Sequence, residues 1–574
     1  MTEQITIALA QINPTVGDIA GNLAKLSAAR DEAAGQGADL VVASELVVSG
    51  YPPDDLVLKP AFQQAVMDSV TDFAKSTAGG PAVLLGAPWR EGGGRDNGAL
   101  HNAALLLADG AIQAIRYKND LPNYGVFDEK RVFRPGPLPD VIGFRGLRLG
   151  VMICEDMWTP TVSAHLRGRG ADILIVPNAS PFEIGKVERR LGLAAARVAE
   201  TQLPLIYVNQ ICGQDELVFD GASFAFAGDG TLACRMPSFA EGMSLLRFRH
   251  QGGWRLEKSD MAPAPERLAA IYGAMMLGLR DYVDKNRFPG VLLGLSGGID
   301  SAISAAVAAD ALGPDRVHGV MMPSPYTSQE SLDDAAACAK LLGVRLDTIA
   351  IEPAMTALDT MLAPSFAGRN RDTTEENIQA RVRGITLMAL SNKFGHMVLS
   401  TGNKSEMSVG YATLYGDMCG GYSVLKDVYK TTVFELSRWR NANQPVGAKG
   451  PRGPVMPERV ITKPPTAELK PNQKDEDSLP PYVVLDAILR LMIEEDLGVG
   501  DIVARGFDRA TVVKVWRMVT IAEYKRRQAP PGVKITRRAF GRERRYPITN
   551  AFNEAALAQE PAQVPPAKTL RPKT

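Results

Sequence analysis

The sequence lacks the patterns that mark several large classes of protein. It has five cysteines in 574 residues, an odd number with no C-x-x-C pair, which argues against a disulfide framework or a zinc cage and predicts a reducing compartment. No apolar run reaches about 18 residues, so we expect no membrane-spanning segment. The first residues, MTEQITIALAQIN, alternate like a strand and carry an early acid, unlike a signal peptide. Together these absences predict a cytoplasmic protein.

Neither sign of charge is in excess. Lys plus Arg and Asp plus Glu both total 64, so nothing indicates nucleic acid or a membrane surface as a partner. The common nucleotide loop G-x-x-x-x-G-K-[ST] does not occur. The five histidines lie outside any motif-like setting, which gives little support to a cysteine–histidine mechanism. With 45% hydrophobic and 22% charged residues, the composition is that of a globular protein with full cores.

The most informative stretch lies near the middle of the chain, where residues 291–301 have the sequence VLLGLSGGIDS. Its apolar half predicts a buried strand, its glycines a turn, and Ser301 opens an alanine-rich, helix-prone segment. Backbone N–H groups of a glycine turn and the N-terminus of a helix favour an anion such as phosphate. An acid beside that turn, Asp300, makes sense mainly as a ligand of Mg²⁺. The alternative is an ordinary tight turn between a strand and a helix.

The N-terminal half alternates apolar runs with helical patterns. Such alternation, without a glycine-rich dinucleotide fingerprint, predicts an α/β layered domain over residues 1–250. A helix is expected at residues 22–35. Strands are expected at residues 5–10, 38–44, 82–86, 103–107, 147–153, 173–176 and 205–208.

Three reactive residues each follow an apolar strand: Glu45, Lys118 and Cys154. The carboxyl ends of strands are where α/β sheets present their chemistry. Singly, each has a plainer explanation as a solvated loop residue or a small core residue. Together they supply a base, a cation and a nucleophile. A thiol needs both partners, because it is only slightly ionised at neutral pH. We therefore expect Lys118 to lower the pKa of Cys154 and stabilise an oxyanion, and Glu45 to carry the thiol proton.

These three residues, in this order and context, resemble the nitrilase superfamily of carbon–nitrogen hydrolases. The run LPNYGVFDEKRVF is closer still to the glutaminase domain of glutamine-dependent NAD⁺ synthetases. The resemblance implies an αββα sandwich and hydrolysis of the glutamine side-chain amide through a thioester on Cys154. It assigns further residues to the glutamine site, with Glu129 as a second carboxylate that supports the lysine: Tyr124, Ser180, Lys186 and Glu129.

The C-terminal half predicts a second α/β unit, a doubly wound parallel sheet with ligand at the strand ends. Residues 228–230 are expected to form a hairpin turn and residues 261–265 a linker. A capping-box-like pair, Thr373 and Glu376, predicts the start of a helix. Strands are expected at residues 316–321, 346–351 and 396–400, and helices at residues 266–284, 331–342 and 373–384.

A second acid, Glu406, follows the predicted strand at residues 396–400 and should face the same crevice as Asp300. Two carboxylates there suit a Mg²⁺ ion bound to substrate phosphates. The stretches LSGGIDS, ENIQARVR, TGNKSE and YGDMCGG resemble, in that order, the ammonia-using NAD⁺ synthetase domain, an N-type ATP pyrophosphatase. The resemblance places Mg²⁺ on Asp300 and Glu406. It places ATP on Gly294, Leu295, Ser296, Gly297, Gly298, Ile299, Asp300, Ser301, Thr401, Lys430 and Thr466.

The same resemblance assigns the dinucleotide substrate deamido-NAD⁺ to Asn377, Arg381, Glu406 and Lys525. For Lys525 and its neighbours Arg526 and Arg527, a solvated basic patch is the alternative. Residues 441–474 are rich in Pro, Gly and charge, so we expect them to bury little and to form a mobile loop over the substrate. The expected divisions are a glutaminase domain (1–250), a linker and leading helix (251–290), a synthetase domain (291–552) and a disordered tail (553–574).

The combined resemblance implies ATP-dependent amidation of deamido-NAD⁺ with ammonia from glutamine, giving AMP, pyrophosphate and glutamate. It also implies a homo-oligomer. Two alternatives remain. Guanylate and asparagine synthetases also couple glutamine to ATP, but the former pairs SGG-x-DS with a Cys–His glutaminase, and the latter needs a cysteine after Met1, where this chain has Thr2. The second alternative is a non-catalytic protein built on a decayed enzyme, against which the full set of reactive residues speaks.

Overall fold

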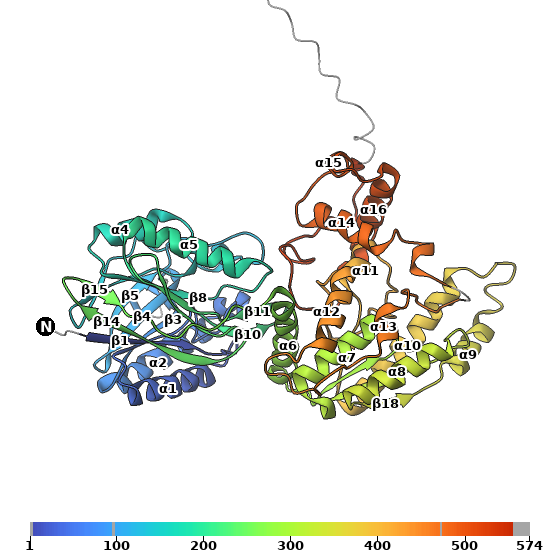
Figure 1. Ribbon diagram of the computed structural model, residues 1–574, viewed down its shortest axis with the longest axis horizontal. Coiled ribbons are helices and arrows are strands. Elements are labelled where there is room, and N and C mark those ends of the chain that lie inside the picture. Colours follow the sequence, from blue (N-terminus) through green and yellow to red (C-terminus); the bar gives the residue numbers. More distant parts are fainter. Residues whose placement is uncertain (1–3, 94–97, 471–472, 555–574) are drawn as a thin grey trace, which may run out of the picture.

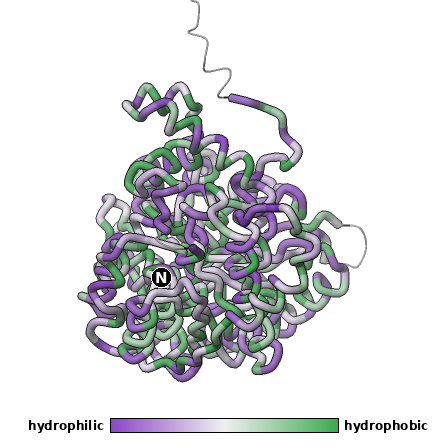
Figure 2. The backbone as a smooth tube through the Cα atoms, turned by 90° about the vertical axis from the view of Figure 1, so that its right-hand side faces the viewer, coloured by the Kyte–Doolittle hydropathy of each residue, from purple (hydrophilic) through white to green (hydrophobic). Residues whose placement is uncertain are grey.

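The computed structural model describes residues 4–93, 98–470 and 473–554, and these form two lobes side by side (Figure 1). Residues 555–574 of the predicted tail lie outside the described residues. No helix in the described ranges is long and apolar enough to cross a bilayer. In Figure 2, hydrophobic and hydrophilic stretches alternate along the described backbone, as expected for a chain that buries one face of each element.

The first lobe is built on two sheets within the described residues. The strand order is β15-β14-β1-β2-β3-β4-β5 in one and β13-β12-β9-β8-β7-β6 in the other. The first sheet comprises β1 (Gln4–Gln11), β2 (Leu40–Val42), β3 (Ala82–Arg90), β4 (Leu100–Ala108), β5 (Ala111–Tyr117), β14 (Gly242–His250) and β15 (Trp254–Leu256). The second comprises β6 (Ile142–Phe144), β7 (Leu147–Val151), β8 (Ile173–Asn178), β9 (Leu205–Asn209), β12 (Phe224–Phe226) and β13 (Leu232–Arg235).

Side chains alternate between the two faces of each sheet, which produces four layers. One face of each sheet packs against the other sheet, with Ile7 and Leu84 meeting Ile175 and Val208. The outer face of the first sheet packs on α1 (Ile19–Gly35) and α2 (Pro60–Lys75). That of the second packs on α4 (Pro160–Gly168) and α5 (Lys186–Thr201). The predicted αββα sandwich is confirmed.

The second lobe contains a parallel sheet of order β18-β17-β16-β19-β20. Its strands are β16 (Val291–Gly294), β17 (Val317–Met321), β18 (Arg345–Thr348), β19 (Met397–Ser400) and β20 (Tyr422–Ser423). One face packs on α6 (Arg267–Lys285), α7 (Ile299–Leu312), α8 (Gln329–Leu342) and α12 (Lys430–Ala442). The other packs on α9 (Glu352–Leu362) and α10 (Thr373–Phe394). Helices on both faces confirm the predicted doubly wound architecture.

A group of helices lies beside this sheet, above it in Figure 1, and packs around an apolar cluster of its own. It contains α11 (Lys404–Val409), α14 (Tyr482–Ile493), α15 (Val499–Ala504), α16 (Arg509–Ile521) and the short α17 (Glu523–Arg526). The remaining α-helices and strands of the described residues are α3 (Glu129–Val132), α13 (Glu458–Thr462) and the hairpin of β10 (Ile211–Gln214) and β11 (Leu217–Asp220).

The lobes meet where α6 lies against the β10–β11 hairpin (Figure 1). Asp281 of α6 accepts hydrogen bonds from the Gly213 amide at 2.8 Å and from Asn13 Nδ2 at 2.7 Å. A Cβ atom on Gly213 would lie 3.0 Å from the Gly278 Cα atom. Glycine therefore permits the close approach of hairpin and helix.

Three local predictions need correction. The helix predicted to open at Ser301 begins at Ile299, which puts Asp300 in its first turn. The capping box of α10 is formed by Asp372 and Glu375, one residue before the predicted pair Thr373 and Glu376. The segment 441–474, predicted to bury little, contributes side chains to the core. Its apolar side chains Val455, Met456, Val460 and Ile461 are almost fully buried in the core of the second lobe.

Candidate active sites

The first candidate site lies at the carboxyl ends of β2, β5 and β7, where Glu45, Lys118 and Cys154 are all buried. The Lys118 ammonium donates to Glu45 Oε1 at 2.6 Å and to Glu129 Oε1 at 2.8 Å. Burial by itself would lower the pKa of Lys118, but the charges of Glu129 and Glu45 raise it well above its ordinary value. The amine is therefore a fixed cation held between two carboxylates.

Cys154 occupies a strained turn at the end of β7. Its φ is +47°, in the left-handed region that residues with a Cβ rarely adopt, and it opens the 3-10 turn Cys154–Met157. Burial, followed by the charge of Glu45, raises the pKa of the thiol well above its ordinary value. Lys118 acts in the predicted direction and lowers that pKa, but its effect is smaller than the combined effect of burial and Glu45. The resting thiol therefore keeps its proton until a base removes it.

The predicted glutamine residue Ser180 is held by a buried ion pair. Arg190 Nε donates to Ser180 Oγ at 3.0 Å, and Arg190 Nη1 donates to Asp220 Oδ1 at 2.7 Å. The Ser180 amide in turn donates to Asn209 Oδ1 at 2.9 Å. These contacts fix the loop after β8 in one conformation.

The two other predicted glutamine residues lie beside the Cys154 turn. The Tyr124 hydroxyl donates to Glu155, the residue after the thiol, at 2.9 and 3.0 Å from its two oxygens. Lys186, the first residue of α5, places its ammonium 4.9 Å from the centre of the Trp158 ring. Burial lowers the pKa of Lys186. A half-buried carboxylate and a buried cation provide complementary partners for the amino and carboxyl groups of an amino acid.

The second candidate site is the turn between β16 and α7. Gly297 has φ of +78°, and a Cβ there would lie 2.2 Å from the Ser331 carbonyl oxygen, so only glycine fits. Ser301 Oγ donates to the Gly298 carbonyl at 2.9 Å and accepts from the Ser296 amide at 3.2 Å. This internal bonding fixes the turn at the N-terminus of a helix of fourteen residues, where an anion is favoured.

Charged side chains converge on this turn. The Lys430 ammonium donates to Asp300 Oδ2 and, at 3.2 Å, to Glu406 Oε1. Asn403 Nδ2 donates to Asp300 Oδ1 at 2.9 Å. Burial is the largest cause of the raised pKa of Glu406, about 8, and the nearby Asp300 adds to it. Asp300 and Glu406 thus face the same crevice, as predicted from their places after neighbouring strands, and Lys430 contacts both carboxylates.

Two adjoining cavities open on the turn. The polar one is lined by Ser296, Asp300, Ser301, Thr401, Glu406, Lys430 and Thr466. The more apolar one is lined by Gly294, Leu295, Met321, Met322 and Leu387, and Thr401 lines both. One cavity therefore offers charge and hydrogen bonds, and its neighbour offers an apolar slot of the kind that holds a nucleobase.

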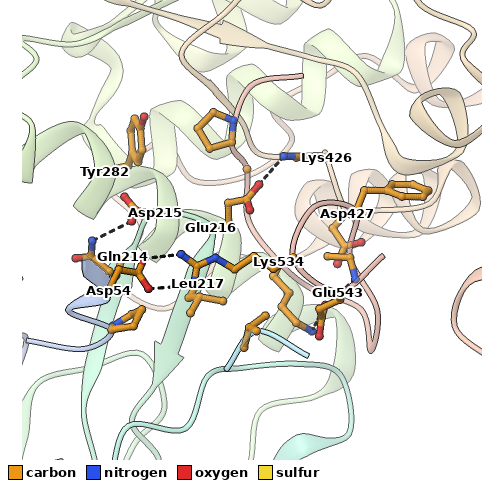
Figure 3. A pocket seen from close by; sticks show the side chains of 17 residues that line it. Asp54, Gln214, Asp215, Glu216, Leu217, Tyr282, Lys426, Asp427, Lys534 and Glu543 are labelled. Atoms are coloured by element: carbon orange, nitrogen blue, oxygen red, sulfur yellow. Dashed lines mark hydrogen bonds and ion pairs between the residues drawn. The ribbon is translucent and has the colours of Figure 1, made fainter. Parts of the chain in front are cut away.

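A further cavity lies between the lobes (Figure 3). Asp54 and Glu216 come from the first lobe, and Lys426, Lys534 and Glu543 come from the second. Lys426 pairs with Glu216 across the junction, and Lys534 Nζ lies 3.2 Å from Glu543 Oε2. The cavity is bounded by fixed ion pairs from both lobes.

Known proteins combine these two sites in one chain. The family model for carbon-nitrogen hydrolases matches residues 6–249, and that for NAD synthase matches residues 271–529. The chain is 49% identical to the glutamine-dependent NAD(+) synthetase of Rhodobacter capsulatus over 555 residues, which cover 96% of this chain and 100% of that protein. The chain belongs to the glutamine-dependent NAD(+) synthetase family.

Solved structures agree with this membership. A glutamine-dependent NAD⁺ synthetase from Acinetobacter baumannii, in complex with ADP, is 44% identical with a TM-score of 0.76, over 96% of this chain and 100% of that one. The synthetase from Cytophaga hutchinsonii has a TM-score of 0.81 at 22% identity, over 97% and 100% of the two chains, and shows the shared fold. Guanylate and asparagine synthetases are thereby excluded.

The four residues predicted to bind deamido-NAD⁺ lie at two neighbouring places in the second lobe, because Glu406 lines one cavity with Ala412, which Lys525 contacts. Asn377 Oδ1 accepts from Thr413 Oγ1 at 2.9 Å, and Arg381 Nε donates to the Leu414 carbonyl at 3.3 Å. Lys525 Nζ donates to the carbonyl oxygens of residues 410 and 412 at 2.7 and 2.6 Å. These three side chains surround the loop after α11, whereas Glu406 lies at the phosphate turn.

Sequence reasoning missed several residues that hold the glutaminase site together. Tyr51 donates to Glu129 Oε1 at 2.9 Å, and Asn102 Nδ2 donates to Glu45 Oε1 at 2.7 Å. Asp156 Oδ1 accepts from the Asp120 amide at 2.7 Å, which ties the Cys154 turn to the segment after Lys118. The place of Asp156 two residues after the thiol, in CEDM, was a signal that could have identified it from the sequence. Tyr51 lies in an ordinary turn and Asn102 in an ordinary apolar strand, and neither pattern indicates a functional residue.

Proposed function

We propose that this chain uses ammonia released from L-glutamine to convert deamido-NAD⁺ and ATP into NAD⁺, AMP and pyrophosphate. The observation that carries the proposal is the presence, in one chain, of the Cys154–Lys118–Glu45 group in the first lobe and the Asp300–Lys430–Glu406 group in the second. The Rhodobacter capsulatus relative, which this chain matches over its full length, is named for this activity. Glutamine, ATP and deamido-NAD⁺ are the proposed small-molecule substrates.

In the first lobe, Glu45 takes the Cys154 thiol proton as sulfur attacks the side-chain carbonyl of glutamine. Two of the three Lys118 N–H donors are occupied by carboxylates, which leaves one for the oxyanion of the tetrahedral intermediate. Collapse of the intermediate breaks the C–N bond, and Glu45 passes its proton to the departing ammonia. Water then attacks the thioester, returns a proton to sulfur through Glu45, and releases glutamate.

Glutamine is oriented by the loops on either side of Cys154. We assign its α-carboxylate to Lys186, whose ammonium forms no ion pair within 4 Å among the described residues. Tyr124 and Ser180 complete the site, and Glu129 supports Lys118 rather than the substrate. Arg190 and Asn209 keep Ser180 in place.

In the second lobe, the nicotinate carboxylate of deamido-NAD⁺ attacks the α-phosphate of ATP and pyrophosphate leaves. Ammonia then attacks the acyl carbon, and AMP departs with the C–O electrons. We assign the phosphates to the turn at residues 294–301 with Lys430, the nucleoside to the adjoining apolar cavity, and Thr401 and Thr466 to the rim. Asn377, Arg381 and Lys525 are the proposed dinucleotide contacts at the neighbouring loop.

The oxygen donors at this turn fit Mg²⁺. Asp300 and Glu406 both contact one ammonium, so their oxygens lie close together. Burial raises the pKa of Glu406, and a bound cation would favour its ionised form. No group of three or more metal-ligating side chains occurs within the described residues, so phosphate oxygens and water would complete the shell. When bound, Mg²⁺ neutralises charge on the leaving pyrophosphate.

We propose that the chain divides into domains at residues 1–250, 251–290 and 291–552, forms a homo-oligomer and is located in the cytoplasm. The free state of the five cysteines is consistent with a reducing compartment. We further propose that ammonia passes directly from the first site to the second, which avoids its protonation in bulk water.

The decisive experiment incubates purified protein with deamido-NAD⁺, ATP, Mg²⁺ and glutamine and follows AMP and NAD⁺. Both products should appear in equal amounts, and ammonium chloride should replace glutamine. A protein that binds the substrates without forming AMP would contradict the proposal and favour a non-catalytic role.

A further inference from the structure

One buried side-chain amide, from a neighbouring strand, contacts the carboxylates of the first site. Asn102, on β4, is fully buried, and its Nδ2 donates to Glu45 Oε1 at 2.7 Å and to Glu129 Oε2 at 3.4 Å. Its backbone carbonyl accepts from the Lys118 amide at 2.8 Å. A single residue therefore contacts both carboxylates by its side chain and the lysine by its main chain.

The chemistry of its neighbours fixes the orientation of this amide. Ionised carboxylates only accept hydrogen bonds, so the NH₂ end must face Glu45 and Glu129. The Oδ1 end then has no donor among the described residues. An amide kept only for packing is expected to satisfy both of its ends, because buried polar atoms are rarely left unpaired. Here only the end that faces the carboxylates is satisfied.

The Asn102 amide can offset negative charge between Glu45 and Glu129. Two carboxylates share the single ammonium of Lys118, so the group carries an excess of negative charge in a buried place. The Asn102 amide adds two N–H donors between the carboxylates without adding a charge. Among the described residues, Glu45 Oε2 accepts only from the Ala179 amide, at 2.9 Å, whereas Oε1 accepts from both Lys118 and Asn102. Oε2 therefore has more free lone-pair capacity to receive a proton.

We infer that Asn102 is a positioning residue of the glutaminase. It holds the Glu45 carboxylate in one orientation, with Oε1 anchored and Oε2 directed to proton transfer. This inference rests on the proposed function, because Glu45 must be the base of glutamine hydrolysis.

The test compares Asn102→Asp with Asn102→Ser in the full-length protein. Aspartate matches the shape of asparagine but replaces the donor by a third carboxylate, whereas serine is smaller and keeps a short donor. We expect kcat for glutamine hydrolysis to fall about a hundredfold or more in Asn102→Asp and less in Asn102→Ser, with KM for glutamine changed by less than about threefold. A packing role predicts the opposite ranking, because the serine leaves a cavity.

The pH profile supplies a second readout. A donor to the ionised base lowers the pKa of that base, so its loss should move the acidic limb of kcat/KM to higher pH by about one unit. Asn22→Asp is the matched control. Asn22 is also buried in the first lobe, but its Nδ2 donates only to the carbonyl oxygens of Thr15 and Val48. Its pH limb should stay in place.

Ammonia-dependent NAD⁺ synthesis in the same preparations reports on the rest of the fold, and it should be unchanged in both Asn102 variants. Equal loss of both activities, the reverse ranking of the two variants, or an unmoved acidic limb would each overturn the inference. If Asn102→Asp does not fold, the pH limb and kcat of Asn102→Ser decide alone. A wild-type protein that hydrolyses no glutamine refutes the proposed function instead.

Discussion

The Lys118 ammonium lies 2.6 Å from Glu45 Oε1, and both side chains are completely buried. Removing two charges from water is costly, and their attraction offsets that cost only when further hydrogen bonds satisfy the remaining atoms. Here Glu129, Asn102 and the Ala179 amide supply those bonds. The pair is therefore best understood as a prepared reaction group, which keeps a cation and a base in place before glutamine arrives.

Cys154→Ala tests the division of labour between the lobes. Loss of the sulfur nucleophile should reduce glutamine-dependent NAD⁺ formation by more than about a thousandfold. Synthesis from ammonium salts should continue, because the phosphate turn is in the other lobe. The measurement is NAD⁺ formation with each nitrogen source. Cys234→Ala, a buried cysteine between the two sheets, is the matched control and should keep both activities. Loss of ammonia-driven synthesis in a folded Cys154→Ala protein would refute the two-site scheme.

Glu45→Gln tests the electrostatics of the thiol. Burial and then the Glu45 charge raise the pKa of Cys154, so removing that charge should lower the pKa and increase the thiolate at a given pH. Alkylation of Cys154 by iodoacetamide, followed by mass spectrometry, should therefore begin at lower pH in the variant than in the wild type. Glutamine hydrolysis should nevertheless fall by about a thousandfold, because the base is lost. An alkylation profile shifted to higher pH would contradict this assignment of causes.

Asp300→Asn tests the phosphate site. The substitution preserves shape, but it removes one carboxylate from the group shared with Lys430 and Glu406. Pyrophosphate release should fall about a hundredfold or more with either nitrogen source, because charge at the leaving group is no longer balanced. Glutamine hydrolysis should persist in the first lobe. Asp315→Asn, in the short turn after α7, is a control of the same chemistry outside the site. Unchanged pyrophosphate release in Asp300→Asn would remove Asp300 from the proposed metal site.

Arg190→Ala tests the support of the glutamine loop. It leaves Asp220 buried without its 2.7 Å partner, so it should destabilise the first lobe by about 3–5 kcal/mol. It should also raise KM for glutamine, since Ser180 loses the bond that orients it. The control is Arg169→Ala, whose ion pair with Asp140 is exposed and should contribute little to stability. Thermal unfolding and glutamine kinetics of the two variants give the comparison. Similar melting temperatures would show that the buried pair is not a support.

The sequence predicted the two α/β units because their periodicity and their turn residues are local properties. The strand before Gly297 and the helix after it follow from a few neighbouring residues, and so does the position of the reactive residues at strand ends. Resemblance to a family supplied the roles of Ser180, Lys186 and Arg381. None of this reasoning required knowledge of which strands pair.

Only the tertiary structure decided the contacts that depend on sheet register and on distant partners. Asn102 belongs to an unremarkable buried strand, and it meets Glu45 because β4 lies beside β3 and β5 in the same sheet. Residues 441–474 were expected to bury little from their composition. Val455 and Ile461 are nevertheless buried, because α7, more than 140 residues earlier in the chain, offers them an apolar surface together with the adjacent α12. Composition describes what a segment contains, whereas burial depends on what the rest of the chain places against it. The sequence thus determined the chemistry available, from Cys154 to Asp300, and the fold determined which neighbours hold each group in a working state.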